Sequence, residues 1–359
     1  MSLHILYLAA GLGLLILGAD WLVRGASRLA LRLGLSPLLI GLTVVAFGTS
    51  APELAVSVQS AFAGAAGMAV GNVVGSNIFN VLVVLGASAL ITPLVVQQQL
   101  VRVDVPLLCV VSAVFWAMAA DGRLSTLDGV FLFVGVVAYT VFAVRNGRSD
   151  TPAVEEEYDV KFGNGAATAG LALQLGLIVA GLAALVAGAH WLVEGATGIA
   201  RAFNISETVI GLTIVAGGTS LPEVATSIVA AIRGERDIAV GNVVGSSLFN
   251  LLAIAGLAAI IAPGGLEVPA AIVRFDIPVM LAVAVACLPI FAAGHLIARW
   301  HGALFLVYYL AYLAYLLMDA TGHDALPAYS SMMSAFVLPL TAITLVVLWW
   351  RAPRARRAS

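Results

Sequence analysis

The sequence GTSAPE at residues 48–53 recurs as GTSLPE at residues 218–223, and each copy lies inside a long apolar run. Each motif places a carboxylate, Glu53 or Glu223, where a membrane-spanning segment would meet hydrocarbon. A charge near the centre of a bilayer costs roughly 2.5–3.5 kcal/mol on insertion scales, so such residues are rare and tend to be functional. Two acids in matching motifs therefore predict one functional site built around this pair.

The proline of each motif removes a backbone donor from the helix. Pro52 has no N–H to offer the carbonyl of Gly48, four residues earlier, and Pro222 has none for Gly218. These carbonyls become free acceptors, which a membrane interior tolerates only where another group satisfies them.

Hydroxyl groups flank each carboxylate. A threonine lies four residues before each glutamate, so the two share a helix face, and a serine follows the threonine. Carboxylate, hydroxyl and carbonyl oxygens are the ligands of hard cations such as Ca²⁺ and Na⁺. The alternative is a Pro-kinked helix whose glutamate only hydrogen-bonds within the bundle, but the matching copies favour a cation site. The hydroxyl set is Thr49, Ser50, Thr219 and Ser220.

The composition excludes an ordinary soluble protein. Of the 359 residues, 62% are hydrophobic and 10% charged, against about 25% charged in soluble domains, and the mean hydropathy is +1.07. The net charge of −2 is uninformative about nucleic acid, but because the sequence has no basic groove or interleaved aromatic platform, we expect no nucleic-acid partner. The two cysteines, Cys109 and Cys287, are far apart and suggest neither a disulfide framework nor a metal site. The chain is predicted to be a polytopic membrane protein.

Runs of about 20 apolar residues predict eleven helical spans. The first run lacks the basic start and cleavage site of a signal peptide, so we expect it to remain as a span. The spans lie near residues 4–23, 38–61, 69–91, 103–120, 125–144, 168–189, 207–231, 238–262, 275–293, 299–318 and 330–350. Residues 145–165 are rich in charge, Pro and Gly and predict an aqueous linker.

The two halves of the chain are copies of one unit. Shifting the second half by 170 residues aligns residues 211–256 with residues 41–86 without a gap, and more than half of the positions are identical. The unit contains five spans, an odd number, so the second copy must cross the membrane in the opposite direction. This predicts an all-α membrane protein of two inverted five-helix repeats, with an additional C-terminal helix.

The positive charges support the inversion. With the N-terminus outside the cell, only Arg123, Arg201 and Arg274 of the 17 basic residues lie outside, as the positive-inside rule requires. We therefore expect a cell (inner or plasma) membrane protein with a cytoplasmic C-terminus. The expected units are residues 1–144 (first repeat), 145–165 (cytoplasmic linker), 166–320 (second repeat) and 321–359 (additional helix and basic tail).

A second polar motif follows each glutamate. GNVVGS begins at Gly71 and again at Gly241, and its polar residues are spaced by four, so they form one stripe on a helix. Interhelical hydrogen bonding is the alternative to ion binding for this stripe, and for the first Asn of each copy helix capping is another. The stripes comprise Asn72, Ser76 and Asn80, and Asn242, Ser246 and Asn250.

These motifs resemble the cation/Ca²⁺ exchanger superfamily, specifically its prokaryotic-type Na⁺/Ca²⁺ exchangers. Residues 41–86 and 211–256 are similar to the two α-repeats of that family. Some members carry Asp where this chain has Asn250, and K⁺-dependent relatives characteristically carry an acid there. This departure leaves the central site less anionic and argues against K⁺ cotransport. It implies a metal site of Glu53, Glu223, Thr49, Thr219, Ser50, Ser220, Ser76, Asn80, Ser246 and Asn250, with the carbonyls of Ala46 and Ala216.

The resemblance implies a secondary antiporter that exports Ca²⁺ against Na⁺ by alternating access, with the first and sixth helices sliding. Such a protein is no enzyme, needs no cofactor beside the transported ions, and contacts lipid without an obligate protein partner. A H⁺/Ca²⁺ antiporter on the same fold is the nearest alternative. An intramembrane aspartyl protease would be expected to use two Asp residues, and a cation channel would use oligomeric symmetry instead of an internal repeat.

Overall fold

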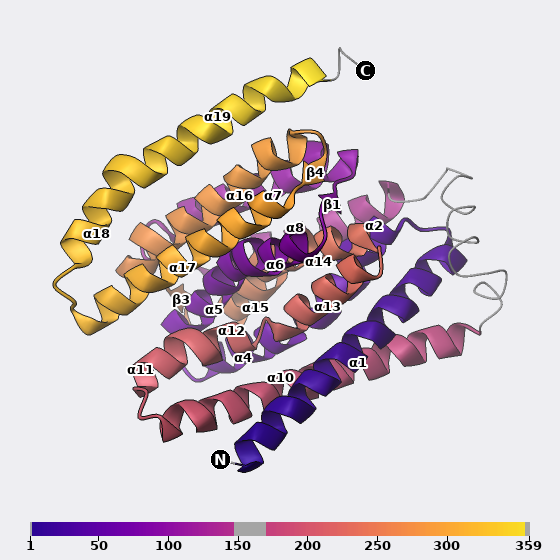
Figure 1. Ribbon diagram of the computed structural model, residues 1–359, viewed down its shortest axis with the longest axis horizontal. Coiled ribbons are helices and arrows are strands. Elements are labelled where there is room, and N and C mark those ends of the chain that lie inside the picture. The colour runs from indigo at the N-terminus through magenta and orange to yellow at the C-terminus, as the bar shows by residue number, and fades with distance from the viewer. Residues whose placement is uncertain (1, 147–169, 356–359) are drawn as a thin grey trace.

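The computed structural model describes residues 2–146 and 170–355, most of which are helical (Figure 1). Short π-helical stretches, labelled η, interrupt several helices. The first half contains α1 (Ser2–Leu33), α2 (Pro37–Ile40), η1 (Gly41–Val45), α3 (Ala46–Thr49), α4 (Ala51–Phe62), α5 (Ala66–Phe79), η2 (Asn80–Leu85), α6 (Gly86–Ile91), β1 (Leu94–Val95), η3 (Leu100–Asp104), α7 (Val105–Ala119), β2 (Arg123–Leu124) and α8 (Thr126–Asn146).

The second half repeats this order of elements and then adds a helical segment. It contains α10 (Leu171–Ala202), α11 (Glu207–Ile210), η4 (Gly211–Val215), α12 (Ala216–Gly218), α13 (Leu221–Ile232), α14 (Arg236–Phe249), η5 (Asn250–Ile254), α15 (Ala255–Ile261), β3 (Leu266–Glu267), η6 (Ile272–Asp276), α16 (Ile277–Ala292), β4 (Leu296–Ile297) and α17 (Arg299–Thr321). The added segment is α18 (Leu326–Met332), η7 (Met333–Val337) and α19 (Leu338–Ala355).

The helices confirm the predicted membrane architecture. In the described part of the chain, nine helices are long and apolar enough to cross a membrane, and the bent pair Pro37–Thr49 and Ala51–Phe62 makes a tenth. The remaining predicted span, 207–231, is broken into the short segments from α11 to α12 and the apolar helix α13. The predicted linker, residues 145–165, lies almost entirely outside the described residues.

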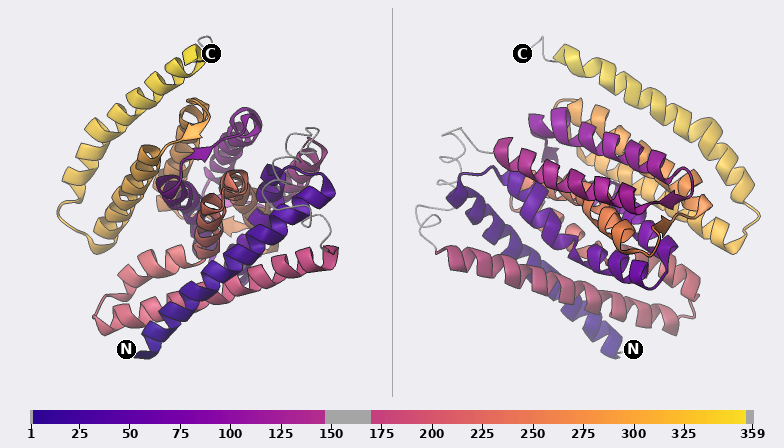
Figure 2. Two further views of the ribbon diagram at one scale, coloured as in Figure 1. Left: turned by 45° about the vertical axis from the view of Figure 1, so that its right-hand side comes forward. Right: turned by 180° about the vertical axis from the view of Figure 1, so that it is seen from behind.

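The first helices of the two repeats, α1 and α10, run antiparallel and pack closely along one side of the molecule (Figures 1 and 2). Glycines permit the approach: a Cβ at Gly11 would lie 2.8 Å from the carbonyl oxygen of Gly188, and one at Gly18 would lie 2.7 Å from that of Gly181. The shift of 170 residues converts the first contact into the second. This exchange is the signature of a two-fold axis between inverted repeats.

Two small strand pairs show the same symmetry. β1 pairs antiparallel with β4, and β2 with β3. Because β1 and β3 are equivalent in the two repeats, as are β2 and β4, each pair joins one repeat to the other. The labels β1 and β4 lie at the opposite end of the bundle from β3 in Figure 1. The repeats are thus tied together at both ends.

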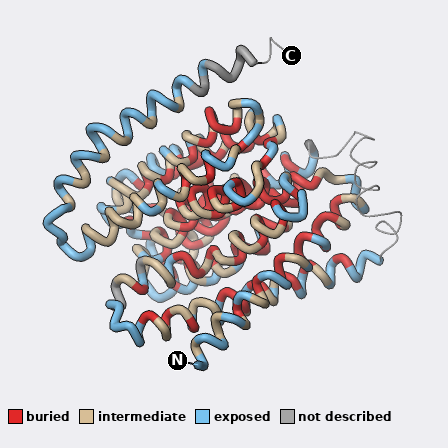
Figure 3. The backbone as a smooth tube through the Cα atoms, viewed as in Figure 1, coloured by how far each residue is buried: buried red, intermediate tan, exposed pale blue. Residues whose placement is uncertain are grey.

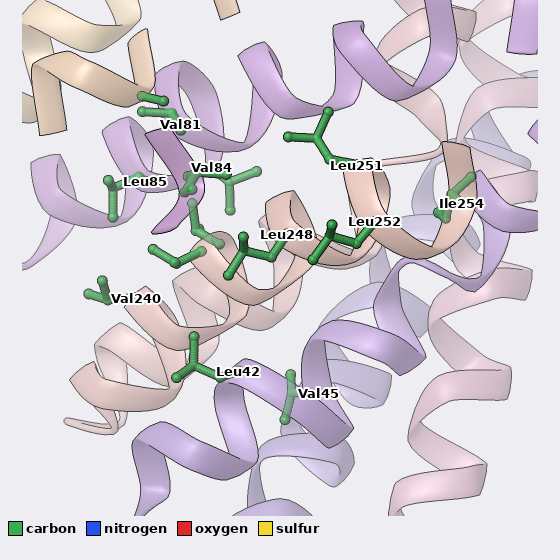
Figure 4. Packing of buried hydrophobic residues seen from close by; sticks show 14 of the residues in the cluster. Leu42, Val45, Val81, Val84, Leu85, Val240, Leu248, Leu251, Leu252 and Ile254 are labelled. Atoms are coloured by element: carbon green, nitrogen blue, oxygen red, sulfur yellow. The ribbon is translucent and has the colours of Figure 1, made fainter. Parts of the chain in front are cut away.

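The centre of the molecule is formed by the second helix of each α-repeat. The continuous helices Ala66–Ile91 and Arg236–Ile261 are the most deeply buried of the candidate spans, and Figure 3 shows the buried residues concentrated there. Val84 of η2 and Leu248 of α14 belong to one cluster of buried apolar side chains (Figure 4). Because lipid tails are as apolar as these side chains, close packing, and not expulsion from water, stabilises such an interface.

The C-terminal segment lies on the outside of the bundle (Figures 1 and 2). It contacts α16 and α17 through both polar and apolar side chains: the Tyr308 hydroxyl hydrogen-bonds that of Thr341, Tyr329 donates to the carbonyl of Ala311 at 2.7 Å, and Leu345 packs against the buried apolar cluster. None of the residues in its most apolar stretch is buried. The segment is therefore an addition to the ten-helix core, as predicted.

Candidate cation-binding site

Both glutamate-bearing helices are interrupted just before the carboxylate. Ser50 has φ −81° and ψ 8°, and Ser220 has φ −89° and ψ 8°, so neither continues the helix. The two parts of the first helix meet at 47°. The cause is the proline at the second position of α4 and of α13, which cannot donate to the preceding turn. A new helix therefore begins at each motif, with the glutamate in its first turn.

The glutamates sit at the N-termini of these new helices. Glu53 and Glu223 are both 0% exposed. The free N–H groups and the dipole at a helix N-terminus favour a negative charge, which offsets part of the cost of burying the two carboxylates. The break in each helix is thus what makes an intramembrane acid tolerable at this position.

Each carboxylate is held by a serine of the opposite repeat. Ser220 Oγ donates to Glu53 Oε1 at 2.7 Å, and Ser50 Oγ donates to Glu223 Oε1 at 2.9 Å. The two hydrogen bonds are exchanged by the two-fold axis. They bring the two motifs, 170 residues apart in sequence, into one site.

The neighbouring oxygens also come from both repeats. Ser246 Oγ donates to the carbonyl of Ala46 at 3.4 Å, and both of these residues are buried. Thr219 lies beside the carboxylate of Glu53, while Thr49 and Ser246 lie beside that of Glu223. Most of the predicted ligand set is therefore gathered around the two glutamates.

Several buried polar atoms of this set make no hydrogen bond within the protein. Because buried polar groups are almost always satisfied, such a concentration points to a ligand. The atoms are Glu53 Oε2, Glu223 Oε2, Ser76 Oγ, Thr219 Oγ1, and both carboxamide atoms of Asn80 and of Asn250.

Asn80 and Asn250 occupy equivalent positions at the start of the π-helical stretches η2 and η5. η2 packs against α13, which carries Glu223, and η5 packs against α4, which carries Glu53. Each carboxamide is buried on a segment that contacts the glutamate helix of the opposite repeat. Wide π-turns inside α-helices occur often at functional sites.

Two sequence expectations do not match the structure. Ala216, expected to contribute its carbonyl, is exposed, whereas its equivalent Ala46 is buried. Asn72 and Asn242 are not helix caps: α5 begins at Ala66 and α14 at Arg236, so both asparagines lie inside their helices.

Two serines of the site escaped the sequence analysis. Ser57 Oγ accepts from Asn72 Nδ2, and Ser227 Oγ accepts from Asn242 Nδ2, at 2.9 Å in both repeats. Both serines are 0% exposed. The signal was available, because each lies four residues after its glutamate and extends the same helix face.

The site offers two carboxylates with many neutral oxygens and little else. The described residues contain no group of three or more His, Cys, Asp or Glu side chains that would hold a metal. Carboxylate, hydroxyl and carboxamide oxygens are the ligands that hard cations prefer. An inverted repeat whose broken helices meet at paired carboxylates defines a membrane transporter, with the site between its halves.

Comparison with known proteins places this transporter in a family. The model of the sodium/calcium exchanger protein family matches residues 3–145 and 173–318. The chain belongs to this family, and it is accordingly an integral membrane transporter with ions as substrates and not an enzyme.

Several relatives are similar over most of their length. The putative antiporter CaxA of Alkalimonas amylolytica is 42% identical over 76% of this chain and 85% of its own. The sodium/calcium exchanger MaX1 of Methanosarcina acetivorans is 33% identical over 88% of this chain and 99% of its own. A solved structure of the sodium-calcium exchanger NCX_Mj matches with a TM-score of 0.75 at 33% identity, covering 88% of this chain and 99% of that one.

Proposed function

We propose that this protein exchanges Ca²⁺ for Na⁺ across the membrane and exports Ca²⁺ from the cytoplasm. The observation that carries the proposal is the pair of reciprocal hydrogen bonds between Ser220 and Glu53 and between Ser50 and Glu223. A site shared equally by two inverted halves can open to either side when one half moves against the other. The description of MaX1 and NCX_Mj as sodium/calcium exchangers supports this choice of ions.

The donor set explains how one site serves both ions. The carboxylates of Glu53 and Glu223 supply a formal charge of −2, which one Ca²⁺ neutralises. The hydroxyls and carboxamides add neutral oxygens, which can coordinate several singly charged Na⁺ ions at separate positions. The proposed neutral ligands are Thr49, Ser50, Ser76, Asn80, Thr219, Ser220, Ser246 and Asn250, with the carbonyl of Ala46; the carbonyl of Ala216 would join them only in another conformation.

The close pairing of α1 with α10 supports alternating access. Glycine contacts hold the two helices together as a unit on one side of the core. In this proposal the pair slides across the core and opens the site first to one side and then to the other. The N-terminus lies outside the inner or plasma membrane, and the linker at residues 145–165 and the C-terminus lie in the cytoplasm.

Flux into proteoliposomes tests the proposal. The purified protein should take up ⁴⁵Ca²⁺ when Na⁺ is trapped inside, and should not do so when the Na⁺ gradient is replaced by K⁺ or by a pH gradient. Uptake driven by the pH gradient alone would show a H⁺/Ca²⁺ antiporter instead. Ca²⁺ counterflow separates a carrier, which exchanges bound ions, from a channel, which does not.

A further inference from the structure

Asn242 joins the two halves of the site through a hydroxyl group. Thr49 Oγ1, in the first repeat, donates a hydrogen bond of 3.1 Å to Oδ1 of Asn242 in the second, and the carbonyl of Ala46 is a more distant acceptor at 3.4 Å. Asn242 is 0% exposed and Thr49 is 1% exposed, so water does not replace this bond. The proton of the Thr49 hydroxyl is therefore committed to a protein acceptor.

The orientation of the Asn242 carboxamide is determined by its other contact. Ser227 Oγ donates to the carbonyl of Ala239 at 3.4 Å, and it accepts from Asn242 Nδ2 at 2.9 Å. Since the serine uses its proton on the carbonyl, only the NH₂ group of Asn242 can face it. The carboxamide oxygen must then face Thr49.

The equivalent asparagine of the first repeat makes a different contact. Asn72 Nδ2 donates both to Ser57 Oγ at 2.9 Å and to the backbone carbonyl of Glu53 at 3.1 Å. Thr219, the equivalent of Thr49, has a buried Oγ1 with no hydrogen bond, although it lies beside the Glu53 carboxylate. The hydroxyls of Thr49 and Thr219 therefore differ in their hydrogen bonds.

We propose that Asn242 is a positioning residue that presets Thr49 as a cation ligand, whereas Thr219 receives no such help from Asn72. The proposal rests on the proposed cation exchange. A hydroxyl has one proton and two acceptor lone pairs, and a cation binds only the lone pairs. With its proton held by Asn242, Thr49 presents lone pairs to the site before an ion arrives. Thr219 must turn its proton away when the ion binds.

A double-mutant cycle on the full-length protein tests this role. The variants are Thr49→Val, Asn242→Leu and the combination, and the readouts are the Na⁺ and Ca²⁺ concentrations that half-saturate binding, measured by calorimetry. Asn242→Leu alone should raise these concentrations about three- to tenfold, the range of one net hydrogen bond. In the Thr49→Val background it should raise them little further, because the hydroxyl that it positions is gone.

The first repeat supplies the matched control. Thr219→Val, Asn72→Leu and their combination should show effects that multiply, because no hydrogen bond joins these residues. Asn242→Ser, which is too short to reach Thr49, serves where Asn242→Leu does not fold.

The outcomes separate the inference from the function. If the effects of Thr49→Val and Asn242→Leu on the half-saturating concentrations multiplied, or if the two repeats showed equal coupling, the positioning role of Asn242 would be wrong. The proposed exchange function would not be affected. A folded wild-type protein that binds neither ion would overturn the proposed function as well.

Discussion

The hydroxyl of Ser50 donates a hydrogen bond of 2.9 Å to Oε1 of Glu223, so a side chain of the first repeat holds the carboxylate of the second. Hydrogen bonds to charged groups contribute about 1.5–3 kcal/mol, more than those between neutral groups. Ser50→Ala should therefore weaken Ca²⁺ binding by roughly tenfold or more. Ser220→Ala should do the same through Glu53, and an isothermal titration of each variant measures the change. If Ser50→Ala bound Ca²⁺ as tightly as the wild type, this hydrogen bond would not contribute to Ca²⁺ binding.

Removal of either carboxylate should abolish exchange. Glu53→Gln and Glu223→Gln each keep the shape of the side chain but leave one charge, which cannot offset the dehydration of a divalent ion. Both variants should remain folded, as size-exclusion chromatography would show. Glu194→Gln is the matched control, because Glu194 is an exposed carboxylate on α10. Ordinary Ca²⁺/Na⁺ exchange by a folded Glu223→Gln protein would contradict the assigned site.

The repeat and its inversion could be predicted from the sequence because they follow from countable features. The matching motifs around Glu53 and Glu223, the odd number of spans and the position of the basic residues carry that information. The weakening of the helices before Pro52 and Pro222 could also be predicted, since neither proline can donate to the carbonyl four residues earlier.

The differences between the repeats could not be predicted. Identical motifs in the two copies predict identical roles. Ala46 is nevertheless buried, whereas Ala216 is exposed. Asn242 accepts a hydrogen bond from Thr49, whereas Asn72 donates to a backbone carbonyl. These differences depend on how the halves pack against each other in one conformation. Periodicity within one helix contains no information about that packing.

The glycines between α1 and α10 should be sensitive to a single methyl group. A Cβ at Gly18 would lie 2.7 Å from the carbonyl oxygen of Gly181 and 2.8 Å from the backbone nitrogen of Leu185, so Gly18→Ala must push the helices apart. Overpacking of this kind costs about 1–3 kcal/mol. We expect a lower melting temperature in detergent and slower exchange.

Gly13 provides the control on the same helix. A Cβ at Gly13 would meet nothing within 4 Å, so Gly13→Ala should be neutral or should stabilise α1 by up to about 1 kcal/mol. Equal melting temperatures and exchange rates for Gly18→Ala and Gly13→Ala would show that close contact of α1 with α10 does not matter for stability or transport.

A third carboxylate in the site should change its ion requirement. Asn250 is 1% exposed, and both atoms of its carboxamide lack a partner in the protein. Asn250→Asp adds a negative charge near two others, and the repulsion among the three favours the binding of an additional proton or cation. Exchange should then become more sensitive to acid between about pH 6 and 8, or depend on a further cation such as K⁺. Unchanged pH and cation profiles of ⁴⁵Ca²⁺ flux would place Asn250 away from the ions.

The charge of the site determines whether transport responds to voltage. With Glu53 and Glu223 ionised, the empty site carries about −2, and one Ca²⁺ neutralises it, so the Ca²⁺-loaded protein changes conformation without moving charge. We propose that three Na⁺ exchange for one Ca²⁺, which gives the Na⁺-loaded site about +1. Each cycle then carries one positive charge inward for each Ca²⁺ exported. That charge is worth roughly 2.3 kcal/mol per 100 mV, and an inside-negative potential should accelerate Ca²⁺ export.

Valinomycin and a K⁺ gradient impose the potential that tests this cycle. In Ca²⁺-loaded proteoliposomes with Na⁺ outside, an inside-negative K⁺ diffusion potential should speed Ca²⁺ efflux, and an inside-positive one should slow it. Exchange of two H⁺ for one Ca²⁺ would be electroneutral, because protonation of Glu53 and Glu223 also gives a neutral site. If the rate of Na⁺-driven Ca²⁺ efflux did not change with the potential, one of two assumptions would be wrong: that three Na⁺ exchange for one Ca²⁺, or that the site contains only two charges. The Glu53→Gln protein, with one carboxylate left, should show no Na⁺-driven efflux at either potential, which separates carrier-mediated flux from leak.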